Sequence, residues 1–209
     1  VEKVLSNNSA LTQEEAVEKV AASLGLTGVD VLSFDAYADQ SSMTDEEKDT
    51  AHSVKQANNK VMTVIKTFAA AAEGAGLDEE DAFDVSVGAL LETVISGVVI
   101  DFSAGSEEMI AVTTKLKLDA AAKAVEKNVT LDGAEFAAVV DSAAKSVANV
   151  VTLITATDKD STEEQLRDLF STVSVVASEV LKTSIAVTDG VIGSDTAAIE
   201  ASMTTATGT

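Results

Sequence analysis

His52 is the only histidine of the 209-residue chain, and the sequence contains no cysteine. A zinc site of the usual kind needs several histidine or cysteine ligands, which this chain cannot supply. A di-iron bundle needs Glu-x-x-His on two helices, and a serine hydrolase of the common kind needs a Gly-x-Ser-x-Gly turn; both patterns are missing. We therefore expect His52 to be an exposed helix residue and the chain not to be an enzyme.

Carboxylates are densest in the segment 158–164, whose sequence is Asp-Lys-Asp-Ser-Thr-Glu-Glu. Oxygen ligands of this kind suit Ca²⁺, and the segment begins like an EF-hand loop. It departs from that loop at the sixth position, where Glu163 replaces glycine, and it has no glutamate at the twelfth. Capping of the following helix explains the same residues without a metal, so both interpretations stay open. The candidate ligands, for Ca²⁺ as the one suggested cofactor, are Asp158, Asp160, Ser161, Glu163 and Glu164.

The charge balance limits the classes of partner that the chain can bind. Fourteen basic and 35 acidic residues give a net charge of −21, which repels nucleic acid and anionic membranes. Arg167 is the only arginine, and aromatic side chains that could stack on bases make up 3% of the chain. No apolar run comes near the roughly 20 residues of a membrane-spanning helix, the longest candidate being 94–100. We expect no nucleic-acid partner and no membrane insertion.

The elements that hold these residues are predicted to be helices. The chain has no proline, and Ser, Thr or Asp repeatedly stands three residues before an acidic residue, as in a capping box. These pairs are Thr12 with Glu15, Thr44 with Glu47, Asp78 with Asp81, Asp132 with Glu135 and Ser161 with Glu164, and Ser106 and Ser194 are further caps without the full box. Apolar residues recur at spacings of three and four between these starts, for example at 136, 140, 143, 147, 150 and 154, and at 83, 87, 90, 94 and 98. The fold class is therefore all-α, a bundle of about seven helices. The expected ranges are 12–24, 44–74, 78–100, 106–127, 132–156, 161–188 and 194–204, with a helical turn at 30–38.

One stretch has an alternative. Ile110, Val112, Thr114, Leu116 and Leu118 alternate with period two, as in a strand. A small β-hairpin within 94–118 is therefore the alternative to the helix at 106–127.

The domain organisation is expected to be simple. Residues 1–203 form a single helical bundle domain, with two helical halves, 1–104 and 105–203, as the alternative. Residues 204–209, rich in threonine, are linker-like. Residues 1–5 already have the composition of a helix end, so we expect a fragment or a processed chain.

Three stretches resemble a helical region of very large, acidic, secreted bacterial repeat proteins with cadherin-like or haemolysin-type calcium-binding segments. They are 16–26, which ends in Leu-Gly-Leu, the Asp-containing turn 28–35, and the Ala/Val/Asn-rich helix 56–77. The resemblance implies an extracellular or cell-surface location, a calcium-rich setting, and an adhesive or structural role. It implies no catalytic residues.

The leading hypothesis is a non-catalytic structural or interaction module of an extracellular bacterial adhesin, matrix or filament protein. Its partners would be other proteins or identical copies, giving a homo-oligomer. The first alternative is a calcium-binding or calcium-stabilised helical module. The second is a small-ligand carrier that uses the bundle interior, where only Asn58, Asn59 and Asn149 offer polar groups on otherwise apolar faces.

Overall fold

The structure is a computed structural model that describes residues 1–161, 163–193 and 195–207, apart from the side chains of Gln40, Glu163, Glu164, Leu166, Arg167, Phe170, Thr196 and 204–207. Within that part, eight α-helices and one 3₁₀ turn form and no strand does, which confirms the all-α class with one helix more than expected. The helices are α1 (Glu2–Asn7), α2 (Gln13–Ser23), α3 (Asp45–Gly74), α4 (Glu79–Ser96), α5 (Glu107–Lys127), α6 (Gly133–Thr155), α7 (Glu163–Thr188) and α8 (Thr196–Thr207), and the 3₁₀ turn η1 is Gln40–Ser42.

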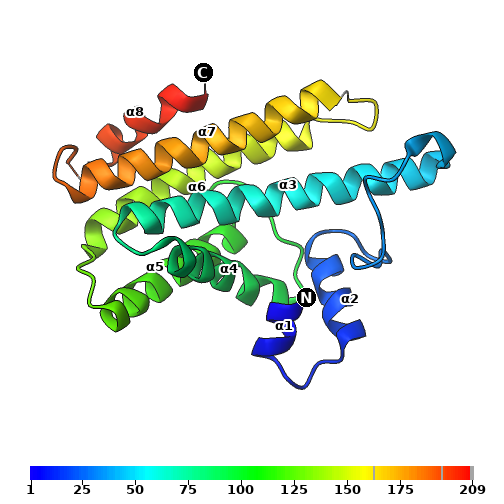
Figure 1. The fold of residues 1–209 in the computed structure, drawn as a ribbon, viewed down its shortest axis with the longest axis horizontal. Helices are drawn as coiled ribbons and strands as arrows, with labels where there is room; N and C mark the ends of the chain where they lie inside the picture. The colour runs from blue at the N-terminus through cyan, green and yellow to red at the C-terminus, as the bar shows by residue number, and fades with distance from the viewer. Residues whose placement is uncertain (162, 194, 208–209) are drawn as a thin grey trace.

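The helix α3 organises the molecule. It has 30 residues and runs along most of the longest dimension (Figure 1). Its most extensive contacts are with α7, followed by α4 and α6. The helix α8 lies on α6 and α7, α5 lies on α4 and α6, and the short α1 and α2 lie against α4. Elements from both halves of the chain therefore share α3 as their common support.

Helix starts follow the predicted caps. Thr12 and Thr44 each accept a hydrogen bond from the backbone N–H three residues on, and the carboxylates of Glu15 and Glu47 accept one from the backbone N–H of the cap residue. Asp78, Ser106 and Asp132 also cap their helices through the side chain. Of the remaining predicted caps, Ser161 is described, but the side chain of its expected partner Glu164 and the whole of Ser194 lie outside the described residues.

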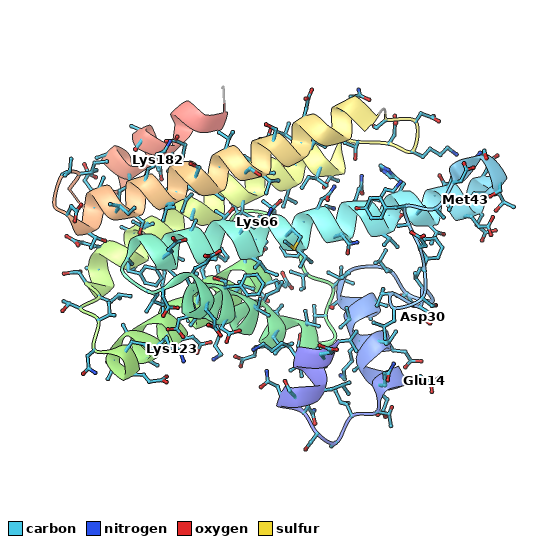
Figure 2. All side chains as sticks on the ribbon, in the orientation of Figure 1. Glu14, Asp30, Met43, Lys66, Lys123 and Lys182 are labelled. Carbon is cyan, nitrogen blue, oxygen red and sulfur yellow. The ribbon has the colours of Figure 1, made fainter. Side chains whose placement is uncertain are left out.

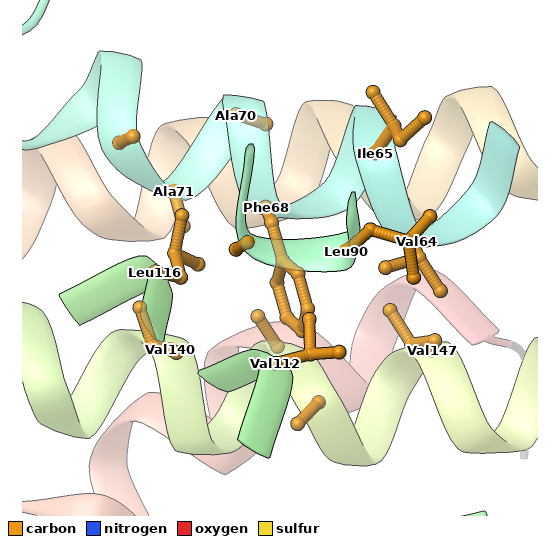
Figure 3. Packing of buried hydrophobic residues seen from close by; sticks show 14 of the residues in the cluster. Val64, Ile65, Phe68, Ala70, Ala71, Leu90, Val112, Leu116, Val140 and Val147 are labelled. Atoms are coloured by element: carbon orange, nitrogen blue, oxygen red, sulfur yellow. The ribbon is translucent and has the colours of Figure 1, made fainter. Parts of the chain in front are cut away.

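The main core consists mainly of alanine and valine side chains, with a few larger residues such as Phe68, Phe136 and Leu116 among them. Phe68 is completely buried and points from α3 toward α5 and α6, between Leu90, Val112 and Val140 (Figure 3). This cluster draws residues from Val4 in α1 to Met203 in α8. A smaller cluster joins α2, the 24–43 segment and the first half of α3. The predicted stripe from Phe136 to Ile154 is buried throughout, whereas Phe83 and Val98 of the α4 stripe are 47% and 51% exposed.

The alternative hairpin within 94–118 is wrong. Gly97 ends α4 in a left-handed conformation, residues 98–106 form a loop, and the N–H of Ile100 donates to the carbonyl of Ser23 rather than to a paired strand. The apparent alternation arose because α5 is apolar on two sides. Its buried face is Met109, Val112, Thr113, Leu116, Ala120 and Ala124, whose spacing is helical.

The predicted helical turn at 30–38 forms only in part: the N–H of Phe34 donates to the carbonyl of Asp30 at 2.9 Å, as in a single helical turn, but no helix follows before η1. Asp30, Asp35 and Asp39 each accept a hydrogen bond from the backbone N–H two residues on, at 2.9–3.0 Å. Such aspartate turns compete with helix formation because the side chain replaces the helical carbonyl as acceptor. The chain becomes helical only at η1.

The helix α6 is long and apolar enough to cross a membrane by length and composition, although no such run was recognised in the sequence. Most of that stretch is buried within the bundle. Its burial between α3, α5, α7 and α8 accounts for its composition as that of a core helix.

Alanine should have opposite effects on stability at two glycines: Gly74, where α3 crosses α7, and Gly88, within α4. A Cβ on Gly74 would collide with Ser184 Cβ and lie 2.8 Å from the carbonyl oxygen of Leu181, so Gly74→Ala should lower the free energy of unfolding by about 1–3 kcal/mol. Gly88, within α4, has room for a Cβ, its nearest neighbour being Asp119 Oδ2 at 3.6 Å. Gly88→Ala should therefore raise stability by about 0.5–1 kcal/mol. Urea unfolding of both variants measures this, and equal effects of the two would contradict the close crossing.

Candidate functional site

The predicted calcium ligands lie in the turn between α6 and α7. Asp158 Oδ1 accepts hydrogen bonds from the N–H of Asp160 at 3.0 Å and the hydroxyl of Ser161 at 3.2 Å. The structure thus brings Asp158, Asp160 and Ser161 together, while the side chains of Glu163 and Glu164 lie outside the described residues. Among the residues described, no three His, Cys, Asp or Glu side chains converge as metal ligands. Calcium binding here stays a prediction.

A lysine already serves as counter-ion beside this turn. Lys159 Nζ lies 3.3 Å from Asp49 Oδ1 on α3, and that hydrogen bond, with the charges of Asp49, Asp45 and Asp160, raises the pKa of Lys159. Its ammonium neutralises part of the negative charge that a bound metal ion would otherwise balance.

The turn is fastened to α3 by two further side chains. His52 Nε2 donates to the carbonyl oxygen of Thr157 at 3.0 Å, and Gln56 Nε2 donates to the same oxygen at 2.9 Å and to the carbonyl of Ile154 at 3.1 Å. These bonds attach the carbonyl of Thr157, just beyond α6, and that of Ile154, in its last turn, to side chains of α3. His52, expected to be exposed, is half-buried because it packs over this turn.

The asparagines proposed for an interior ligand site do not converge. Asn58 and Asn149 are exposed, on α3 and α6, and only Asn59 is buried. The amphipathic pattern could not separate these positions, because asparagine is common at the edge of a buried face.

The outer face of α5 is the most prominent uncovered apolar feature. Ala111, Thr114, Leu118, Ala121 and Val125 are exposed at spacings of three and four, and Ile110 flanks them. The exposed fractions are 64% for Leu118, 79% for Val125 and 55% for Ile110. We call these six residues the α5 stripe. Figure 1 shows α5 at the edge of the molecule, where its main contacts are with α4 and α6.

The same helix gathers cations. It carries Lys115, Lys117, Lys123 and Lys127 against Glu107, Glu108, Asp119 and Glu126, so four positive and four negative charges give a net charge of zero in a chain of −21. Figure 2 marks Lys123 on this helix. All four lysines reach carboxylates on neighbouring helices: Glu92, Asp141, Asp81 and Asp78. The lysines that border the stripe are therefore already paired.

The pair Lys127–Asp81 is one of the two shortest of these links, with Nζ 2.6 Å from Oδ2, as in Lys117–Asp141. The ammonium of Lys127 holds the pKa of Asp81 below its usual value, and Asp81 in turn raises the pKa of Lys127. Sequence reasoning treated Asp81 only as a member of a capping box. It could not assign a lysine 46 positions later as its partner (127 − 81 = 46).

No protein family, curated protein or solved structure matches this chain. The α5 stripe and the lysines beside it are the features of the described residues that the fold alone does not account for.

The lowered pKa of Asp81 predicts how the α4–α5 contact responds to acid. A carboxylate with a folded pKa below its unfolded value stabilises the fold above about pH 4, and that contribution disappears as the pH falls through the folded pKa. Asp81→Asn should therefore reduce stability at neutral pH and lose less on acidification than the unaltered chain. Urea unfolding between pH 7 and pH 3 measures this, with the exposed Asp189→Asn as control. Parallel pH profiles for Asp81→Asn and the unaltered chain would rule the pair out as a stabilising contact.

Calcium binding at the turn predicts a shift in thermal unfolding. A site with a dissociation constant of about 1 mM would gain ~1.4 kcal/mol at about 10 mM Ca²⁺. The melting midpoint should then rise relative to EGTA at matched ionic strength, and Asp158→Asn with Asp160→Asn should abolish the rise. A melting midpoint that does not change with calcium would show that the turn binds no calcium.

Proposed function

We propose that the chain is a non-catalytic structural module of an extracellular bacterial adhesin, matrix or filament protein, and that it associates with an identical copy through the α5 stripe. The observation that carries the proposal is a continuous, uncharged, exposed apolar face on the one long helix whose charges sum to zero. Apolar contact removes this face from water and is the main driving force of association.

Charge favours a second copy as the occupant. Two molecules of −21 repel one another over most of their surface, and the repulsion is least where positive and negative side chains balance. A basic partner would be drawn instead to the acidic starts of α3 and α4, at Asp45–Glu47 and Asp78–Asp81. A neutral stripe on an acidic molecule is thus best matched to itself.

The polarity of α5 favours an antiparallel pair. Glu107 and Glu108 stand at its first turn, and Lys123 and Lys127 near its last. A parallel arrangement would place like ends and like helix dipoles together, whereas an antiparallel one pairs opposite ends. The stripe runs from Ile110 to Val125, so a two-fold axis near Leu118 lets it cover itself.

The extracellular setting draws its support from the acidic surface and from the resemblance to secreted repeat proteins. At physiological ionic strength the Debye length is about 8 Å, so salt screens the repulsion between acidic copies. A matrix or filament also holds copies near one another, where effective concentrations reach about the millimolar range. A contact made by one helix is small and, as a free pair in solution, weak.

Replacement of Leu118 tests the proposal. Leu118→Lys lowers the net negative charge, so it weakens long-range repulsion while it interrupts the stripe. We expect the unaltered chain to form dimers as its concentration rises and Leu118→Lys to stay monomeric, measured by sedimentation equilibrium or light scattering. Val191→Lys is the matched control, because Val191 is 78% exposed and lies in the α7–α8 connection.

Two results would count against the proposal. Monomers at all concentrations would show that the stripe does not bind a copy, and a partner module would then be its occupant. Equal weakening by Leu118→Lys and Val191→Lys would show that association does not use α5.

A further inference from the structure

Lysine is scarce in this chain, and nearly every lysine has a partner. Nine of the 13 lie within 4 Å of a carboxylate: Lys3, Lys48, Lys115, Lys117, Lys123, Lys127, Lys145, Lys159 and Lys182. Lys19 donates to the carbonyl of Ile95, and the Lys55 ammonium lies 5.1 Å from the centre of the Tyr37 ring. Lys66 is exposed to water. Lys60 alone is half-buried without an anionic, carbonyl or aromatic partner among the described residues.

Lys60 lines a cavity of about 410 Å³ that lies where α3 meets the end of α2, the 99–102 loop and the end of α6. Its apolar walls include Leu24, Val99, Phe102 and Val151. The lining is mixed, because Ser53, Gln56, Asp101 and Thr155 stand beside these apolar residues and beside the half-buried Lys60 of α3. We call this cavity the Lys60 pocket.

Burial in the pocket lowers the pKa of Lys60, because the ammonium loses water and gains no counter-charge. Asp101, the one carboxylate of the lining, does not relieve this. It is exposed, accepts a hydrogen bond from the N–H of Ser103 at 2.8 Å, and forms no ion pair with Lys60.

We propose that the Lys60 pocket binds the carboxylate of a small amphiphile, with the carboxylate against Lys60 and the apolar tail against the walls of the pocket. The carboxylate supplies the counter-charge that the other lysines find within the fold. Burial of the aliphatic tail stabilises the complex and offsets the repulsion between the ligand's carboxylate and a chain of strong negative charge. This site is distinct from the α5 stripe and does not depend on association between copies.

The alternative explanation is that Lys60 only places its aliphatic stem over the smaller core cluster and extends its ammonium to water. It predicts no saturable binding of a carboxylate.

The experiment titrates ¹⁵N-labelled chain with sodium octanoate and follows amide shifts by NMR. We expect saturable shifts confined to residues that border the pocket, in 24–26, 53–60, 99–102 and 151–155, and at least a tenfold weaker affinity for Lys60→Met. Lys60→Arg should retain binding because it keeps the charge. Lys66→Met is the matched control, because it removes an unpaired but exposed lysine from the same helix (Figure 2).

Octanol and acetate test the contributions of the ligand's tail and carboxylate separately. We expect octanol, which lacks the charge, and acetate, which lacks the tail, both to bind at least tenfold more weakly than octanoate. Equal binding of octanoate and octanol, shifts outside these segments, or no saturation would overturn the proposal. If Lys60→Met does not fold, the shifts of the unaltered chain and the Lys60→Arg variant still decide. Leu118→Lys should bind octanoate as the unaltered chain does, which separates this inference from the proposed association.

Discussion

The placement of a few cations among many carboxylates constrains the whole molecule. The chain has thirteen lysines and one arginine against 35 acidic residues, so most carboxylates have no cation to pair with. The ion pairs that do form lie largely between elements: Lys3 with Asp84 links α1 to α4, Lys127 with Asp81 links α5 to α4, and Lys145 with Glu200 links α6 to α8. Exposed ion pairs add little stability one by one. Their effect here is to lower repulsion where helices must approach.

The core imposes a complementary constraint. It is built mainly from alanine and valine, and among the side chains that the structure describes only Phe68 is both aromatic and completely buried. Small side chains let helices approach closely, and α3 and α7 come so near that the hydroxyl of Ser184 donates to the carbonyl of Ala71, and that of Thr188 to Gly74. The main contacts of α5 are with α4 and α6, so its outer side stays uncovered by the described helices.

The sequence was informative where local chemistry decides the structure. The capping boxes at Thr12 and Thr44 depend on residues three positions apart, and the stripe from Phe136 to Ile154 depends on helical period, so both could be read directly. A helix that is apolar on two faces could not be interpreted in this way. In α5 a buried and an exposed apolar face overlap in the sequence, and only the position of α4 and α6 determines which is covered.

Contacts between residues far apart in the sequence could not be predicted from it either. Lys60 differs from the lysines of α5 only in what surrounds it after folding, and nothing near it in the sequence marks that difference. The acidic segment 158–164 was recognised by composition, but its attachment to His52 and Gln56, about a hundred residues earlier, depends on the tertiary fold. The spacing of Ala111, Thr114, Leu118, Ala121 and Val125 was the one signal that could have revealed the α5 stripe in advance.

Cross-linking through a single introduced cysteine is the most direct test of the central claim, that α5 pairs with its copy in an antiparallel arrangement. The chain contains no cysteine, so Leu118→Cys carries one unique thiol near the expected two-fold axis. Mild oxidation should yield a disulfide-linked dimer for Leu118→Cys, and none for Glu107→Cys or the exposed Val191→Cys, since a disulfide requires Cα atoms within about 7 Å. Equal cross-linking at all three positions, or at Glu107 in preference to Leu118, would contradict the account.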